Sequence, residues 1–325
     1  MTQISGTVPG RILLTGGAGF IGSHLAEALL GRGCELLVLD DLNGYYDPAL
    51  KRANLEAVRR AGAFEFVQGD ICDAALVEAL FARFRPAAVV HLAARAGVRP
   101  SLEQPALYQR VNVEGTAVLL EAARRHGAQR FVFASSSSVY GAASRVPFSE
   151  DDPVRAPISP YAASKIAGEA LCHVYSHLYG MRTVCLRFFT VYGPRQRPDL
   201  AIRKFAESIA AGRPIPVFGD GSTGRDYTYI DDIVAGILAA MAHDAGFEVF
   251  NLGNSSPVLL REMIATLERV LGKEAVIDRQ PLQPGDVPIT YADISKAKRL
   301  LGWAPRTALE TGVRRMVEWL GLECA

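Results

Sequence analysis

The stretch ILLTGGAGFIG, from Ile12 to Gly22, places four glycines between an apolar run and the amphipathic segment SHLAEALLGRG. Gly16, Gly19 and Gly22 form G-x-x-G-x-x-G, a spacing typical of a turn that joins a strand to a helix. Glycines there let the backbone approach a pyrophosphate, whose charge then lies at the N-terminus of the helix. A glycine triplet by itself also fits a plain tight turn. The stretch therefore predicts a strand, a turn and a helix, and leaves two functions for the turn open.

The pattern continues along the first two thirds of the chain. Apolar runs begin near Arg11, Glu35, Phe64, Ala87, Arg130 and Arg182. Amphipathic segments separate them, such as DAALVEALFARF and NVEGTAVLLEAARRHG, the second of which we expect Asn112 to cap. Continuous apolar strands alternating with helices predict a parallel sheet that is covered on both faces. The fold class is therefore α/β, with a Rossmann-type doubly wound parallel sheet.

From about Leu200 the alternation loosens, and Pro and Gly become frequent. We expect residues 1–195 to form a Rossmann domain, to which a segment at about 225–255 returns. Residues 196–325 are expected to form a smaller, mostly helical C-terminal lobe. Open α/β sheets bind ligands at the carboxyl ends of their strands, where this lobe would lie.

Composition excludes several classes of function. The 325 residues include 35 Lys plus Arg and 34 Asp plus Glu, so no strong field exists to attract nucleic acid or an anionic membrane. The longest later apolar stretch, IVAGILAAMA, is shorter than the about 20 residues that a spanning helix needs. Five scattered cysteines and no evident export signal favour reduced thiols and a cytoplasmic location. The expected partners are a small molecule and a second copy of the chain, and no metal site is predicted.

Two acids follow the glycine turn. The run ELLVLD ends at Asp40, 18 residues beyond Gly22, where a carboxylate would bond the adenosine ribose hydroxyls. The same carboxylate would repel the additional phosphate of NADP, so the sequence favours NAD as the cofactor. Asp41 is an alternative, and Asp40 is favoured. Asp70 closes the third apolar run and is a second acid suited to the adenine, or a simple turn residue.

The segment SPYAASK carries the candidate chemistry. Ser159 and Pro160 are typical of the cap and first residue of a helix. Tyr161 and Lys165 are four residues apart and therefore share one face of that helix. An ammonium group can lower the pKa of a neighbouring phenol, which then acts as a base near neutral pH. The spacing Y-x-x-x-K is common by chance, but here it follows the strand FASSSSVYG and the glycine turn.

These motifs, together with HLAA at His91, NVEGT and RDYTYIDD, resemble the extended short-chain dehydrogenase/reductase family over essentially the whole chain. The resemblance is specifically to its NAD-dependent nucleotide-sugar epimerases. It implies that the domain of residues 1–195 binds NAD and that the lobe of residues 196–325 binds the nucleotide sugar. It implies that Tyr161 is the catalytic base, that Lys165 bonds the nicotinamide ribose, and that Ser136 bonds the sugar hydroxyl. Arg225 would clamp the diphosphate, as guanidinium groups can.

The resemblance also implies a cofactor site and a mode of assembly. The expected cofactor residues are Gly16, Gly19, Phe20, Ile21, Gly22, Asp40, Asp70, Ile71, Leu92, Ala93, Ala94, Asn112, Tyr161 and Lys165. Relatives pair through the helices that correspond to VEGTAVLLEAARRHG and SKIAGEALCHVYSHLYG, so a homodimer is expected.

Three serines distinguish among the reactions of this family. Dehydratases carry Thr-Asp-Glu before the Val-Tyr-Gly, and the two acids drive the elimination of a hydroxyl. Here the matching residues are Ser136, Ser137 and Ser138, so dehydration lacks its acid and base. Related decarboxylases tend to have Glu in place of Ser138. What remains is 4-epimerisation through a 4-keto sugar, after which the same hydride returns to the other face.

Local departures from the galactose-type epimerases indicate the sugar. Thr190 stands where that subfamily has Asn, and LQPGD, which contains Asp286, replaces an Arg-rich approach. Both features resemble enzymes that interconvert UDP-glucuronate and UDP-galacturonate. Oxidation at C4 of a uronate gives a β-keto acid, which loses CO2 when its carboxylate aligns with the carbonyl π system. We expect Arg197, with Thr190 and the serines, to hold that carboxylate out of alignment.

Further substrate contacts and alternatives complete the prediction. Val217 and Phe218 match the uracil site, and Arg99 is a candidate for the anionic substrate. UDP-glucose or UDP-N-acetylhexosamine 4-epimerisation and UDP-glucuronate decarboxylation are the alternative reactions. A dinucleotide-binding regulator without activity is the alternative from another class of protein.

Overall fold

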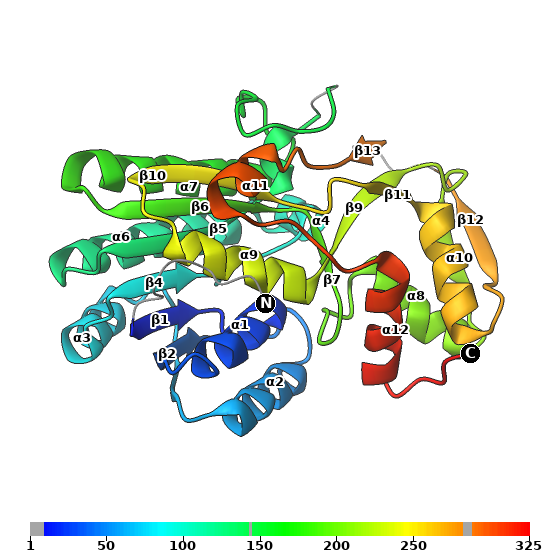
Figure 1. The fold of residues 1–325 in the computed structure, drawn as a ribbon, viewed down its shortest axis with the longest axis horizontal. Helices are drawn as coiled ribbons and strands as arrows, with labels where there is room; N and C mark the ends of the chain where they lie inside the picture. The colour runs from blue at the N-terminus through cyan, green and yellow to red at the C-terminus, as the bar shows by residue number, and fades with distance from the viewer. Residues whose placement is uncertain (1–9, 143–144, 282–287) are drawn as a thin grey trace.

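A seven-stranded parallel sheet organises the molecule, which is described by a computed structural model for residues 10–142, 145–281 and 288–325 (Figure 1). The strand order is β10-β6-β5-β4-β1-β2-β3, and every neighbouring pair is parallel. The six predicted strands are confirmed as β1 (Arg11–Thr15), β2 (Glu35–Asp40), β3 (Glu65–Gln68), β4 (Ala88–His91), β5 (Arg130–Ser136) and β6 (Arg182–Phe188). The seventh, β10 (Phe247–Leu252), returns from late in the sequence.

Alternation within the strands builds a core on each face of this sheet. Along β1, Ile12 and Leu14 belong to one apolar cluster, and Leu13 belongs to the other. The first cluster includes residues of α1 (Phe20–Leu30), α2 (Pro48–Ala61) and α9 (Ile230–Ala242). The second includes residues of α3 (Ala74–Phe84), α6 (Gly115–Arg125) and α7 (Pro160–Tyr179). The predicted coverage of both faces is therefore confirmed.

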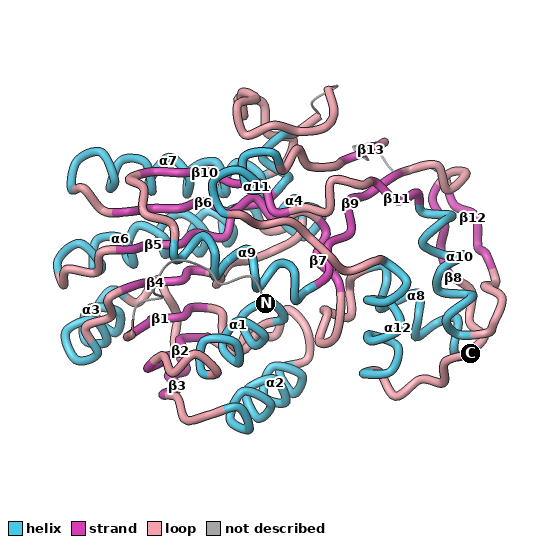
Figure 2. Tube along the Cα trace, in the orientation of Figure 1, coloured by secondary structure: helices cyan, strands magenta, loops and turns pink. Residues whose placement is uncertain are grey.

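A smaller lobe stands beside the sheet, at the right of Figures 1 and 2. It contains the helices α8 (Ala201–Ala210), α10 (Leu260–Leu271) and α12 (Leu309–Trp319). Strand β9 (Gly224–Tyr229) pairs with β7 (Thr190–Tyr192), β11 (Pro257–Leu259) and β13 (Ile289–Thr290). Strands β8 (Ile215–Phe218) and β12 (Ile277–Gln280) form a parallel pair. Helices supply most of the regular structure of this lobe, as expected, and short strands accompany them.

The later part of the chain crosses between the two units. Helix α9 packs on β5 and β6, and β10 joins the edge of the large sheet. Helix α11 (Ser295–Leu301) packs against β10. These positions fit a return at about 225–255, although β9 itself lies in the small sheet, and the division of domains at 195 stays a prediction.

The helix starts test two sequence predictions. Ser159 caps α7 as expected, because its Oγ accepts a hydrogen bond of 3.1 Å from Ala162 N, and Pro160 is the first helical residue. The prediction that Asn112 caps a helix is wrong. Asn112 lies in a π-helical turn, η1 (Arg110–Glu114), between α5 (Pro105–Gln109) and α6. Its side chain does not cap a helix because it forms tertiary hydrogen bonds with the backbone of Arg95.

Two whole-chain features complete the fold. All five cysteines are free thiols, and Cys34, Cys172 and Cys185 are buried. Within the ranges that the structure describes, every helix is too short or too polar to cross a membrane.

Candidate active site

A cavity of about 510 Å³ runs along the carboxyl ends of the central strands. Its lining includes most of the predicted residues, namely Gly16, Gly19, Phe20, Ile21, Gly22, Asp40, Asp70, Ile71, Leu92, Ala93, Ala94, Ser136, Ser137, Ser138, Tyr161, Lys165, Thr190 and Arg197. The fold thereby brings the glycine turn, the three serines and the Y-x-x-x-K helix to one site, as open α/β sheets do with ligand-binding residues.

The glycine turn has a shape that side chains would destroy. Gly16 has φ +73°, and a Cβ there would lie 2.6 Å from Ala93 N. A Cβ at Gly22 would lie 2.1 Å from Gly16 O. The turn closes through a hydrogen bond of 3.1 Å from Gly19 N to Gly16 O, and α1 begins at the next residue. This compact approach of bare backbone to a helix N-terminus fits a pyrophosphate.

Asp40 and Asp41 both line the cavity, at the end of β2. Asp40 binds the glycine turn to the strand end, because its carboxylate accepts hydrogen bonds from Ala18 N at 3.1 Å and Leu42 N at 2.9 Å. Burial raises the pKa of Asp40, while the Leu42 N–H and the charge of Lys51 oppose that shift. Asp41 accepts from Asn43 N at 3.0 Å. The preference for Asp40 as the ribose ligand stays a prediction.

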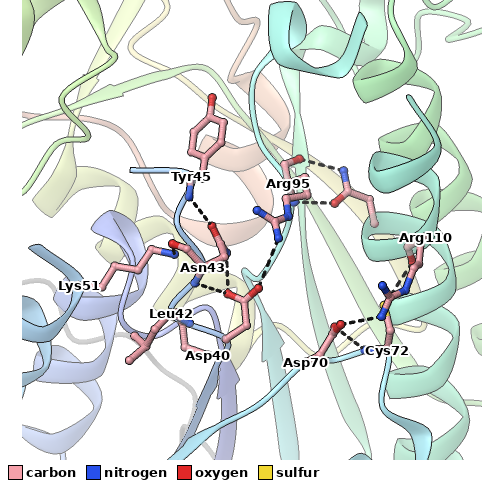
Figure 3. Close-up of polar contacts among 11 residues, drawn as sticks. Asp40, Leu42, Asn43, Tyr45, Lys51, Asp70, Cys72, Arg95 and Arg110 are labelled. Carbon is pink, nitrogen blue, oxygen red and sulfur yellow. Dashed lines mark hydrogen bonds and ion pairs between the residues drawn. The ribbon is translucent and has the colours of Figure 1, made fainter. Parts of the chain in front are cut away.

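Sequence reasoning missed several cavity residues: Asn43, Tyr45 and Tyr46 in the loop after β2, Lys51 in α2, and Arg95 in the loop after β4. Figure 3 shows two of their contacts, in which Asn43 Oδ1 accepts from Tyr45 N at 3.1 Å and Lys51 Nζ donates to Asn43 O at 3.0 Å. Arg95 Nη2 lies 3.7 Å from Asp41 Oδ2. The run of turn-forming residues in DDLNGYYD was a usable signal for this loop.

Arg95 has a further property that bears on a ligand. Its Nε is buried, and the structure places no hydrogen-bond partner on it among the described residues. A buried guanidinium N–H without an acceptor is costly, and an anionic or carbonyl group of a bound molecule would satisfy it. Arg95 also lines the cavity, so this buried donor belongs to a residue that borders the ligand space.

Asp70 and Asn112 meet the cavity in different ways. Asp70 lines it, and its carboxylate accepts from Arg110 Nη2 at 2.8 Å and from Cys72 N at 2.9 Å (Figure 3). Asn112 is buried behind the lining. Its Oδ1 accepts from Arg95 N at 2.8 Å, and its Nδ2 donates to Arg95 O at 3.0 Å. Asn112 thus fixes the loop that carries Arg95 rather than facing the cavity.

Tyr161 and Lys165 lie on one face of α7, as predicted. Lys165 Nζ donates to Ala134 O at 2.7 Å and lies 5.9 Å from the centre of the Tyr161 ring. Burial lowers the pKa of Lys165 to about 8. The expected fall of the Tyr161 pKa does not hold for this structure: burial raises it, and the hydrogen bond with Ser136 and the charge of Arg197 only oppose the rise. Desolvation of the phenolate is the reason for the difference.

The part of the cavity beside Tyr161 also carries hydroxyls and a guanidinium. Ser136 Oγ donates to Ser138 Oγ at 3.1 Å, and Thr190 lies nearby in the lining. Arg197 donates to Asp199 through Nε at 2.9 Å and Nη2 at 2.8 Å. Its guanidinium lies 5.4 Å from the centre of the Tyr45 ring. This part of the cavity can hold a small anion through a guanidinium and several hydroxyl donors.

Four further predicted substrate residues, Arg99, Val217, Phe218 and Arg225, do not line this cavity. Arg99, on α4 (Val98–Glu103), lies over the Phe218 ring at 5.5 Å, so these two predicted residues do come together. Val217 is buried in the core, since alternation along β8 directs it inward. Arg225, on β9, donates to Gly224 O at 2.8 Å. Asp286 falls outside the described residues.

Comparison with known proteins extends this picture. Residues 13–316 match a family described as GDP-mannose 4,6 dehydratase. The UDP-glucuronate 4-epimerase of Thermodesulfobacterium geofontis is 44% identical, over 95% of this chain and 96% of that protein. The crystal structure of UDP-glucuronic acid 4-epimerase from Bacillus cereus, in complex with UDP-glucuronic acid and NAD, has a TM-score of 0.88 and 38% identity, covering 96% of this chain and 99% of the other. A UDP-glucose 4-epimerase from Thermotoga maritima, with UDP-glucose, has a TM-score of 0.88 and 35% identity, covering 96% and 98%.

Proposed function

We propose that this chain, which belongs to the family described as GDP-mannose 4,6 dehydratase, converts UDP-glucuronate to UDP-galacturonate, as its UDP-glucuronate 4-epimerase relatives do. It is an NAD-dependent UDP-sugar 4-epimerase, like the relatives that cover nearly its whole length. The observation that supports a uronate substrate is that Arg197, Thr190 and the serines line the cavity together. They offer the hydrogen-bond donors that a carboxylate requires.

The residues present fit the cofactor. The glycine turn offers bare backbone to a pyrophosphate, Asp40 or Asp41 would bond the adenosine ribose, and Lys165 would bond the nicotinamide ribose. When bound, NAD supplies the chemistry of accepting a hydride from C4 of the sugar and returning it to the opposite face. The carboxylate at the end of β2 favours NAD over NADP, because a second phosphate would meet a negative charge.

The chain's own residues provide the acid–base chemistry. Tyr161 accepts the proton of the C4 hydroxyl and gives it back at the end of the cycle. Ser136, hydrogen-bonded to Tyr161, bonds the same hydroxyl and positions it. The Lys165 ammonium stabilises the phenolate once it forms. Neither Ser137 nor Ser138 supplies the carboxylate that an elimination needs, which supports epimerisation over dehydration.

Arg197 would prevent a side reaction. A 4-keto uronate is a β-keto acid and decarboxylates when its C–COO⁻ bond aligns with the carbonyl π system. Charge-assisted hydrogen bonds from Arg197, with Thr190 and Ser137, would hold the carboxylate away from that alignment. Asp199 and Tyr45 in turn fix the guanidinium.

Incubation of the purified protein with UDP-glucuronate, without added NAD, tests this function. We expect NMR to show UDP-galacturonate at equilibrium with substrate, and no UDP-pentose. UDP-glucose and UDP-N-acetylglucosamine serve as competing substrates in the same assay, and faster turnover of either would overturn the uronate assignment. Arg197→Ala should lower uronate turnover and release UDP-pentose; unchanged turnover with no pentose would remove Arg197 from the proposal.

We also propose that the protein acts as a homodimer in the cytoplasm. The exposed face of α7 carries Val174 and Leu178, whose exposed fractions are 43% and 61%. Apolar side chains of that size on neighbouring turns favour burial against a second copy. The five free thiols support a reducing compartment, which cell fractionation would test.

A further inference from the structure

A buried ion pair lies directly beside the proposed catalytic residues, and the mechanism above makes no use of it. Arg187 on β6 donates to Glu169 on α7 through Nε at 2.9 Å and Nη2 at 2.8 Å. The two side chains are only 4% and 8% exposed. Removal of one partner of a buried ion pair typically costs several kcal/mol of stability, whereas replacement of both charges by apolar groups often costs little. Stability alone therefore does not explain why an ion pair lies here.

The pair is continuous with Lys165 and with the end of β5. Tyr161, Lys165 and Glu169 follow one another at intervals of four along α7, and therefore share a face. Ala134 O accepts from Lys165 Nζ, and the next residue, Ser135, donates its hydroxyl to Glu169. Two consecutive residues of β5 are thus fastened to α7, immediately before Ser136.

The far side of the ion pair holds the other end of the serine segment. Arg187 Nη1 donates to the Tyr140 hydroxyl at 3.0 Å, and that hydroxyl donates to Asn251 Oδ1 at 2.7 Å. Tyr140 closes the short helix η2 (Ser137–Tyr140), which contains Ser137 and Ser138. The cluster of Ser135, Tyr140, Glu169 and Arg187 therefore holds the three serines from both ends.

The charges around Lys165 are few. Cys172 on α7 and Cys185 on β6 face it, and burial raises the pKa of the Cys185 thiol, which keeps it neutral. His91 on β4 is neutral as well, because burial lowers its pKa to about 3. Phe133 of β5 presents its ring 4.9 Å from Nζ. Among the described residues that act on Lys165, Glu169 is the anion that opposes the cost of burying the ammonium.

We propose that Glu169, held by Arg187 and Ser135, is a positioning residue that keeps Lys165 protonated near neutral pH and so allows Tyr161 to ionise as the base. Arg187 balances the charge of Glu169 by donating hydrogen bonds to both of its carboxylate oxygens. The proposal rests on the proposed role of Tyr161 as the base, but not on which UDP-sugar is turned over.

The test compares Glu169→Gln with the double variant Glu169→Gln/Arg187→Met. The single variant leaves Arg187 buried without its partner, so it is expected to lose stability, and the double variant removes both charges together. Thermal unfolding of each protein records this difference. The measurement that decides is ultraviolet titration of tyrosinate in the cofactor-bound protein, with Tyr161→Phe as the blank.

If Glu169 acts on Lys165, the Tyr161 ionisation moves to higher pH by about one unit or more in both variants, since a neighbouring opposite charge shifts a pKa by that amount. The pH at which kcat/KM rises should move upward by the same interval. Below that midpoint the variants should have about tenfold lower kcat/KM than the wild type, and above it their kcat/KM should recover. A double variant with the wild-type titration, or a loss of activity that is equal at every pH, would overturn the proposal and leave a merely structural ion pair. The titration needs no sugar, so it stands even if the uronate assignment fails.

Discussion

Arg197 is held from two sides by interactions of different kinds. Asp199 fixes the Nε and Nη2 edge through two hydrogen bonds, and the Tyr45 ring lies 5.4 Å from the guanidinium carbon. A cation over an aromatic face gains about 0.5–1 kcal/mol when exposed and about 2 kcal/mol when desolvated. The ring therefore helps to decide where the guanidinium meets a substrate carboxylate.

Replacement of Tyr45 tests this contact at the scale of one residue. Tyr45→Ala should raise the KM for UDP-glucuronate by about tenfold, the equivalent of 1.4 kcal/mol, and should leave the KM for UDP-glucose nearly unchanged. Tyr45→Phe, which keeps the ring, should behave as wild type. Phe64→Ala is the matched control, because its ring packs against Arg59, another arginine–aromatic pair, outside the cavity lining. Equal losses on both sugars would show that Tyr45 shapes the cavity in general and does not act through Arg197.

The same residues show how far sequence reasoning reaches. Asp40 could be predicted because a strand end and a spacing place it, and Tyr161 with Lys165 because a helix repeats every 3.6 residues. Tyr45 and Arg95 could not be predicted, because their neighbours, Arg197 and Asp41, are distant in the sequence and meet only after folding. Val217 was predicted from the resemblance and Arg99 from its charge, and neither lines the cavity.

The first helix depends on a backbone contact that one methyl group would remove. A Cβ at Gly22 would lie 2.1 Å from Gly16 O and 2.7 Å from Gly17 Cα, both of them backbone atoms that cannot rotate away. The start of α1 must therefore move away from β1 if residue 22 carries a side chain. Any group bound by the turn would lose contact with the N-terminus of the helix.

Gly22→Ala is accordingly expected to reduce the NAD that copurifies with the protein and to abolish activity without added cofactor. Release of nucleotide by heat, followed by chromatography, measures the occupancy. Gly31→Ala is the control in the same helix, because Gly31 has φ −61° and a Cβ there would be 3.4 Å from its nearest neighbour. Full occupancy in Gly22→Ala would exclude the turn as the cofactor cradle.

At the scale of elements, apolar runs predicted the strands of the large sheet, whereas capping residues predicted the start of α7 but not that of α6. Continuous apolar runs identified six strands of the large sheet, since helices cover both faces of that sheet. The π-helical turn at Asn112 was not predictable, because the side chain is committed to the backbone of Arg95. Tertiary hydrogen bonds of that kind override the capping preference of Asn.

Across the whole molecule, one helix serves two surfaces. The first turns of α7 bring Tyr161 and Lys165 to the cavity, while Val174 and Leu178 lie exposed near its other end. Helix α6 packs beside α7, so the two present a continuous surface on one side of the large sheet (Figure 1). A partner docked there would stiffen the helix that holds the proposed base, without contributing a group to the cavity.

Leu178→Glu tests this surface by placing a charge where an apolar side chain is 61% exposed. Burial of a leucine is worth about 1.5–3 kcal/mol per copy, and a buried unpaired carboxylate costs more, so the dimer should dissociate at micromolar concentration. Light scattering after size exclusion measures the mass. Val276→Glu is the matched control, since Val276 is 52% exposed in the smaller lobe, and it should leave the dimer intact. A wild-type protein that runs as a monomer, or a Leu178→Glu protein that stays dimeric, would place the interface elsewhere or remove it.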